Sequence, residues 1–132
     1  MIYILDTDTV SFIVRKHHSV IGKLIEHEDD EICISTITYA EICYGLEKKG
    51  SAKLFNEVMS IMGKCTMVDF NNLQSELYGK IRLELEKSGT PLGNMDMLIA
   101  ASALNVGAIL ITHNTKHFSK IKGLIVEDWY EQ

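Results

Sequence analysis

The segment from Pro91 to Thr112 constrains the fold more than any other part of the chain. The run Met-Leu-Ile-Ala-Ala-Ser-Ala-Leu at positions 97–104 is apolar on almost every side. Asn94 is a candidate N-cap for a helix there, and Gly107 is a candidate for the residue after its C-cap. Residues 108–111 then form a short, wholly apolar strand. The segment therefore predicts a helix that lies against a sheet with little access to water.

Short apolar runs alternate with helical patterns along the rest of the chain. Strands are expected at 2–5, 32–35, 65–68, 108–111 and 124–126. Helices are expected at 7–16, 19–25 with Ser19 as cap, 38–49, 51–62 with Ser51 as cap, 71 or 72 to a point before Pro91, 94–106 and 114–119. This alternation predicts the α/β class, with a parallel sheet covered by helices on both faces and joined by right-handed crossovers. The first strand is expected to be central.

Length and composition favour one domain over residues 1–132. The chain has one proline and no Gly- or Ser-rich tract that would serve as a linker. No apolar run is long enough to span a membrane, and the first residues lack the basic region of a signal peptide. Its three cysteines form no C-x-x-C pair, which predicts buried free thiols in a reducing cytoplasm.

The formal net charge of −5 argues against a broad electropositive surface for nucleic acid. It does not exclude nucleic acid as a partner. Carboxylates that cluster around a divalent cation add negative formal charge that the ion cancels.

Polar residues follow or begin four of the expected elements. Asp6 follows the first strand, Glu41 lies in the helix after the second strand, and Asp96 lies in the first turn of the buried helix. Thr112 and Asn114 follow the strand at 108–111. Because ligands of such sheets bind beyond the carboxyl ends of the strands, these side chains are expected to converge.

Each acid taken alone also has a purely structural explanation. Asp6 and Asp8 could cap the first helix, Thr38-x-x-Glu41 fits a capping box, and Asp96 could complement a helix dipole. Together, the carboxylates would repel one another unless a cation neutralised them. An all-oxygen ligand set favours Mg²⁺ or Mn²⁺ over zinc, and such ions serve phosphoryl and phosphodiester chemistry. His113 and His117 lack a third His or Cys nearby, which argues against a zinc site.

Other functions are compatible with parts of this pattern. Asp6-Thr7-Asp8-Thr9 resembles the nucleophile motif of haloacid-dehalogenase-type phosphatases, with Asp6 as nucleophile. No acidic pair follows the strand at 108–111, however, and little of the chain is left for a cap domain. A receiver domain would use Asp69, but no lysine directly follows the last strand. A regulatory binding module without activity is the non-enzymatic alternative, and Asn114 is the feature that suggests it.

Four blocks of the sequence closely resemble the signature blocks of PIN-domain ribonucleases. They read ILDTD at 4–8, STITYAEICYG at 35–45, PLGNMDMLIAA at 91–101 and ITHNTKHF at 111–118. The segment from Gly123 to Trp129 also resembles the VapC toxins of type II toxin–antitoxin systems. The blocks occur in order and cover essentially the whole chain.

The resemblance implies a three-layer α/β/α PIN-like fold with four to five mainly parallel strands. It also implies a cytoplasmic, Mg²⁺-dependent endoribonuclease, with Mn²⁺ as a substitute ion. A VapB-type antitoxin would inhibit it, the protein would be a homodimer, and operator DNA would be bound only through the antitoxin complex. Some relatives of this subgroup cut initiator tRNA, so tRNA is one candidate RNA substrate.

Carried over by position, the resemblance makes Asp6, Glu41 and Asp96 the metal ligands. Thr112 and Asn114 would orient the attacking water or a phosphate oxygen. Three positions depart from the family pattern. Asn114 occupies the fourth acidic position, Asp8 stands where Asn is common, and His117 occupies a position that is often acidic.

Overall fold

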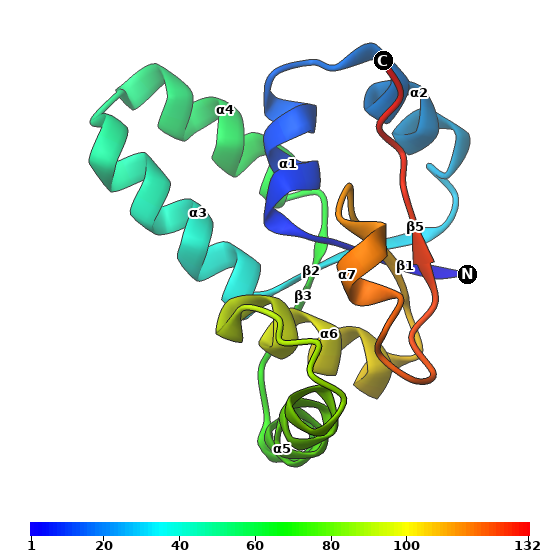
Figure 1. Ribbon diagram of the computed structural model, residues 1–132. Helices are drawn as coiled ribbons and strands as arrows, with labels where there is room; N and C mark the ends of the chain where they lie inside the picture. Colours follow the sequence, from blue (N-terminus) through cyan, green and yellow to red (C-terminus); the bar gives the residue numbers. More distant parts are fainter.

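The computed structural model describes residues 1–132, which form seven helices and one five-stranded sheet (Figure 1). The strands are β1 (Ile2–Leu5), β2 (Glu31–Ser35), β3 (Thr66–Val68), β4 (Ile109–Ile111) and β5 (Val126–Glu127). The helices are α1 (Thr7–Val14), α2 (His18–Glu26), α3 (Thr36–Lys49), α4 (Ala52–Met62), α5 (Asn72–Lys87), α6 (Asn94–Val106) and α7 (Thr115–Phe118). None of these helices is both long and apolar enough to cross a membrane.

The sheet is parallel throughout and has the strand order β3-β2-β1-β4-β5. The central strand β1 pairs on one side with β2, where Tyr3 is opposite Ile32, and on the other with β4, where Leu5 is opposite Ile111. From β1 the chain builds β2 and β3 on one side, and it then returns to the other side of β1 to build β4 and β5. The carboxyl end of β1 is therefore the switch point of the sheet. The predicted parallel sheet with a central first strand is confirmed.

Side chains of the central strands alternate between two apolar layers. Ile4 and Leu110 belong to a cluster that includes residues of α5 and α6. Leu5 and Ile111 belong to a second cluster, which includes residues of α1, α2 and α4. Figure 1 shows α5 and α6 on one side of the sheet and α1 and α2 on the other. The predicted three-layer α/β/α arrangement is confirmed.

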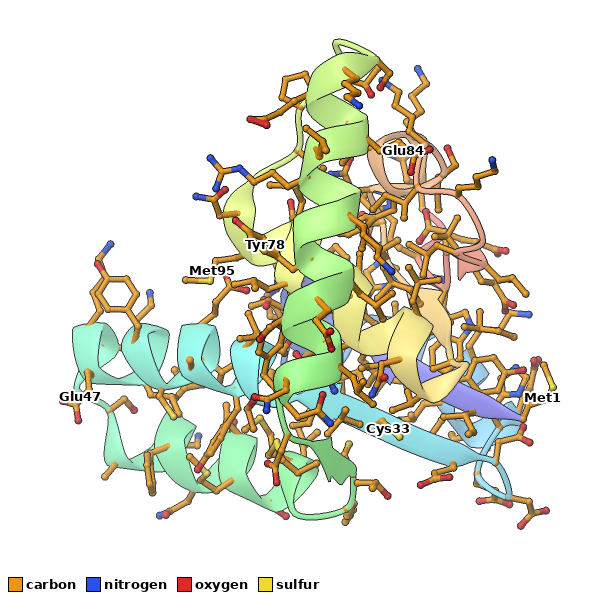
Figure 2. All side chains as sticks on the ribbon, turned by 90° about the horizontal axis from the view of Figure 1, so that it is seen from below. Met1, Cys33, Glu47, Tyr78, Glu84 and Met95 are labelled. Carbon is orange, nitrogen blue, oxygen red and sulfur yellow. The ribbon has the colours of Figure 1, made fainter.

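Helices α3 and α4 form a hairpin that extends beyond the sheet (Figure 1). Only the first part of α3 lies at the sheet edge, because the helix starts directly at the end of β2. Figure 2 shows Glu47 near the outer end of this hairpin, far from Cys33 in the sheet. The hairpin therefore presents the start of α3, and with it Glu41, at the carboxyl edge of the sheet.

Three of the predicted helix starts are wrong. Ser35, not Thr38, caps α3: its backbone is extended, and its Oγ accepts a hydrogen bond from the Thr38 N–H at 3.0 Å. Gly93, not Asn94, is the cap residue of α6, and no side chain caps that end. His17, not Ser19, precedes α2. In each case the polar residue that the pattern predicts as the cap lies in the first turn of the helix.

Two other predictions also need correction. The last strand is β5 at Val126–Glu127 rather than 124–126. All three cysteines are free, but only Cys33 is buried, whereas Cys43 and Cys65 are partly exposed. Burial raises the pKa of the Cys33 thiol to about 11, with Glu31 and Cys65 as smaller causes.

Candidate active site

Asp6 ends the central strand and also caps the helix that follows. Its Oδ1 accepts a hydrogen bond from the Thr9 N–H at 2.8 Å, and its own N–H donates to the carbonyl of Ile111 at 3.1 Å. The residue is 5 % exposed. Burial raises the pKa of this carboxyl, the charge of Asp8 adds to the rise, and hydrogen bonds from Thr112 and Thr9 oppose it. The capping role is thus real, and it places a desolvated carboxylate at the switch point of the sheet.

Thr112 follows β4 and is fully buried beside Asp6. Its side chain hydrogen-bonds Asp6, and its Oγ1 accepts a hydrogen bond from the Asn114 N–H at 3.0 Å. Asn114 is partly exposed at the start of α7, and its side-chain oxygen is hydrogen-bonded to the ring of His117. The loop after β4 therefore brings both predicted residues to the same edge as Asp6.

Glu41 lies in the second turn of α3, because that helix begins at Thr36. The capping-box explanation for Glu41 is therefore wrong. The Thr7 hydroxyl donates a hydrogen bond to Glu41 Oε1 at 2.5 Å, which joins the first residue of α1 to α3. The sequence offers no reason to single out Thr7, since the contact bridges positions 34 residues apart.

Asp96 lies in the first turn of α6 and is partly buried. The pKa of its carboxyl is raised, first by burial and then by the charges of Asp6, Glu41 and Asp8, while His117 lowers it. Asp6 and Glu41 are thus near enough to Asp96 to disfavour its ionised form. The fold brings together side chains from four separate segments of the chain.

These carboxylates do not form a finished metal cage. No three His, Cys, Asp or Glu side chains lie close enough together to hold an ion between them. Mg²⁺ usually keeps several water molecules and uses only one or two carboxylates together with substrate phosphates. The donor set of carboxylate, hydroxyl and amide oxygens fits such a partly hydrated cation. His113 is hydrogen-bonded to Asp128 Oδ2 at 2.8 Å.

The chain matches a known domain family over most of its length. The sequence pattern of the PIN domain family matches residues 3–124. Ribonuclease VapC2 of Rickettsia felis is 35 % identical to the chain over 132 residues, which cover 98 % of each protein. The tRNA(fMet)-specific endonuclease VapC of Salmonella typhimurium is 31 % identical over 128 residues, which cover 96 % of this chain and 97 % of the relative.

Solved structures show the same relationship. A structure of VapBC2 from Rickettsia felis bound to a promoter DNA fragment contains a chain with a TM-score of 0.91 and 34 % identity, covering 98 % of this chain and all of the other. DNA-bound VapBC from Salmonella typhimurium contains one with a TM-score of 0.89 and 30 % identity, covering 98 % and 99 %. The chain therefore belongs to the PIN-domain family and, within it, to the VapC group.

Proposed function

We propose that this protein is an Mg²⁺-dependent endoribonuclease and the toxin of a type II toxin–antitoxin pair. The observation that carries the proposal is the convergence of Asp6, Glu41 and Asp96 at the carboxyl edge of the sheet. Burial raises the pKa of Asp96 there, and the charges of Asp6, Glu41 and Asp8 add to the rise. Acids crowded in this way favour a bound cation, which removes their mutual repulsion. Membership of the VapC group supports RNA as the substrate, because the curated relatives are named ribonucleases.

The proposed roles follow from the contacts of each residue. When bound, Mg²⁺ would polarise a phosphate oxygen and activate water. Asp6 and Asp96 would hold the ion. Glu41, positioned by Thr7, would bind the ion through a water molecule or orient the attacking water. Asn114 is partly exposed and would orient that water or a phosphate oxygen.

Thr112 has a different role in this proposal. It is fully buried, hydrogen-bonded to Asp6, and accepts the Asn114 N–H. It would therefore hold Asp6 and Asn114 in place without touching substrate. Thr112 is a positioning residue here rather than a catalytic one.

The partners of the relatives support the same proposal. The two solved relatives described above are VapBC complexes with bound DNA. We infer for this chain a VapB-type antitoxin as inhibitor, a homodimeric toxin in the cytoplasm, and contact with operator DNA through the antitoxin. The name of the Salmonella typhimurium relative makes initiator tRNA the first substrate to test.

The test is to incubate the purified chain with initiator tRNA and with total RNA, in Mg²⁺ and in EDTA, and to map the cut ends. Cleavage is expected only with the metal. Asp6→Asn and Asp96→Asn should each lower the rate by at least about 100-fold, a loss typical of removing one stabiliser of transition-state charge. Asp29→Asn, which changes an exposed acid in the turn between α2 and β2, is the matched control and should cut at the wild-type rate.

The outcomes also separate the alternatives. Cleavage that persists in EDTA, or full activity of Asp96→Asn, would contradict the metal assignment. A phosphatase of the haloacid-dehalogenase type would form an acid-stable aspartyl-phosphate on Asp6 when given a phosphate ester. A regulatory binding module would bind RNA with Mg²⁺ present and leave it uncut.

A further inference from the structure

Four rings form a continuous stack where the turn between α1 and α2 contacts the C-terminal segment. We call this stack the ring ladder; its members are Phe12, Tyr130, His17 and His18. Successive ring centroids lie 4.5 Å apart from Phe12 to Tyr130, 4.2 Å from Tyr130 to His17, and 5.0 Å from His17 to His18. Figure 1 shows the C-terminus beside this turn.

Toward His18, the rings of the ladder become more nearly parallel and more exposed to solvent. The angle between successive ring planes falls from 37° to 32° and then to 21°. Phe12, His17 and Tyr130 are partly buried, whereas His18 is exposed. The last step is thus a nearly parallel stack that ends in a ring open to solvent. A flat ring system could continue this stack on the outer face of His18.

The inner end of the ladder lies beside the candidate active site. The ring of His113 is 4.5 Å from that of Tyr130 and meets the edge of Phe12 at 5.8 Å. His113 itself stands between Thr112 and Asn114 in the loop after β4. The ladder therefore leads outward from the loop that contains Asn114, the residue proposed to orient water or a phosphate oxygen.

Positive charge is concentrated at the same turn. Arg15 and Lys16 directly precede His17, in a chain whose net charge is −5. The Arg15 guanidinium lies 5.1 Å from the centre of the Phe12 ring. Lys16 has a φ of 59° and is the only non-glycine residue with a positive φ. The turn thus keeps two exposed cations beside the stack despite a backbone conformation that disfavours side chains.

Asp128 is already engaged, whereas the exposed carboxylate of Glu131 makes no salt bridge. Asp128 accepts hydrogen bonds from His113 and from the Tyr130 N–H at 2.8 and 2.9 Å. Glu131 is tied through its backbone to the hydroxyl of Ser19. These bonds fix the C-terminal segment against the turn and leave Arg15 and Lys16 without a carboxylate partner in the structure.

We propose that the ring ladder, with Arg15 and Lys16, binds a single-stranded segment of the RNA substrate next to the cut site. One base stacks on the outer face of His18, and the two cations hold backbone phosphates. This combination of stacking rings and a cationic track is how proteins bind single strands with little sequence preference. The inference depends on the proposed ribonuclease function, because it names a substrate-binding surface for that site.

The alternative is that the ladder only fastens the C-terminal segment to the α1–α2 turn. The two roles differ in what they require of the outermost ring. Phe12 and Tyr130 are partly buried and would serve either role. His18 is exposed and outermost, so its ring contributes little to the fold but is essential for stacking a base. Substitutions at His18 therefore distinguish the two roles.

The test measures binding of a fluorescently labelled oligo(A) strand of about 12 nucleotides by anisotropy, using the full chain in EDTA so that no cutting occurs. His18→Ala should weaken binding about tenfold, and His18→Phe, which keeps a ring, should restore it. Phe55→Ala removes an exposed ring on α4 (48 % exposed) and should bind as the wild type does. The double variant Arg15→Gln/Lys16→Gln should lower the slope of log affinity against log salt by about 1.4.

Each result decides the inference. If His18→Ala binds the strand with wild-type affinity, or if His18→Phe does not restore binding, the inference is overturned. The ribonuclease proposal would remain intact. Unchanged melting temperatures across the His18 variants are expected, and a drop that follows the loss of binding would favour the fastening role. If the wild type neither binds the strand nor cuts RNA in Mg²⁺, the proposed function itself fails.

Discussion

Asp96 shows, at the scale of one residue, that crowding acidic side chains in a site lowers the stability of the folded protein. Its folded pKa is raised by burial and by three neighbouring acids. Because the folded state then binds the proton more tightly than the unfolded state, stability falls as pH rises from the unfolded pKa through the folded one. In EDTA at neutral pH, Asp96→Asn should therefore melt at a higher temperature than the wild type.

The same thermal melts test whether Asp96 is a ligand of Mg²⁺. A hundredfold excess of Mg²⁺ over its dissociation constant should stabilise the wild type by about 2.7 kcal/mol, because the ion binds only the folded chain. Asp96→Asn should gain much less. Equal stabilisation of both proteins by Mg²⁺ in thermal melts would mean that Asp96 is not a ligand.

Cys33 should be the least reactive of the three cysteines. Its thiol is 2 % exposed and has a pKa of about 11, so roughly one molecule in a thousand carries the thiolate at pH 8. Ellman's reagent should therefore spare Cys33 in the folded protein and modify all three cysteines in urea. Cys43 should react first, because burial raises the pKa of the Cys65 thiol. Peptide mapping of a partly modified sample gives the order, and modification of Cys33 together with Cys43 would contradict it.

Asp6 and Asp96 were accessible to prediction because each follows a pattern that the sequence displays. Asp6 ends an apolar run and Asp96 opens an apolar helix, so both positions can be predicted without knowledge of any contact. Thr7 could not be assigned a role, because its contact with Glu41 joins two helices that meet only in the folded chain. The ring ladder escaped prediction for the same reason, since it unites residues 12–18 with residue 130.

At the scale of helices, two glycines should respond to the same substitution in opposite ways. Gly79 lies inside α5 with nothing near the position of an added Cβ, and Gly107 ends α6 with a φ of +67° and equally open space. Gly79→Ala should stabilise the protein by about 0.5–1 kcal/mol through helix propensity. Gly107→Ala should destabilise it by about 1–2 kcal/mol, because a side chain disfavours the left-handed backbone. Urea denaturation of both variants gives the signs, and the same sign for both would contradict this explanation.

Helix existence was predictable from apolar spacing, but helix starts were not. Ser35, Thr36 and Thr38 are all plausible cap residues by composition, and the choice falls on Ser35 because β2 delivers it in an extended conformation. At α6 the loop ends at Gly93 without a side-chain cap, so Asn94 enters the first turn. The neighbouring element decides where such a helix begins, and the local sequence pattern does not contain that information.

At the scale of the molecule, the alternation of strands and helices was enough to predict a parallel sheet between two helical layers. It was not enough to predict how the helices are oriented. Figure 2 shows α5 crossing over the sheet, and α3 with α4 extending away from it. Leu77, Ile81 and Leu85 of α5 give the periodic face that sequence displays, but their packing in the layer of α6 sets the direction of the helix. Orientation depends on the partner surface, and no single segment encodes it.

The pairing of β1 with β4 has a consequence for synthesis on the ribosome. The first strand to leave the exit tunnel must wait for residues 109–111 before it acquires its second neighbour, and Thr9 waits equally long for the carbonyl of Ile111. Without β4, the Asp6 N–H also lacks its acceptor, the carbonyl of Ile111. We therefore expect the edge of the sheet that carries Asp6 to be completed late in synthesis, after the codons for residues 109–111 have been read.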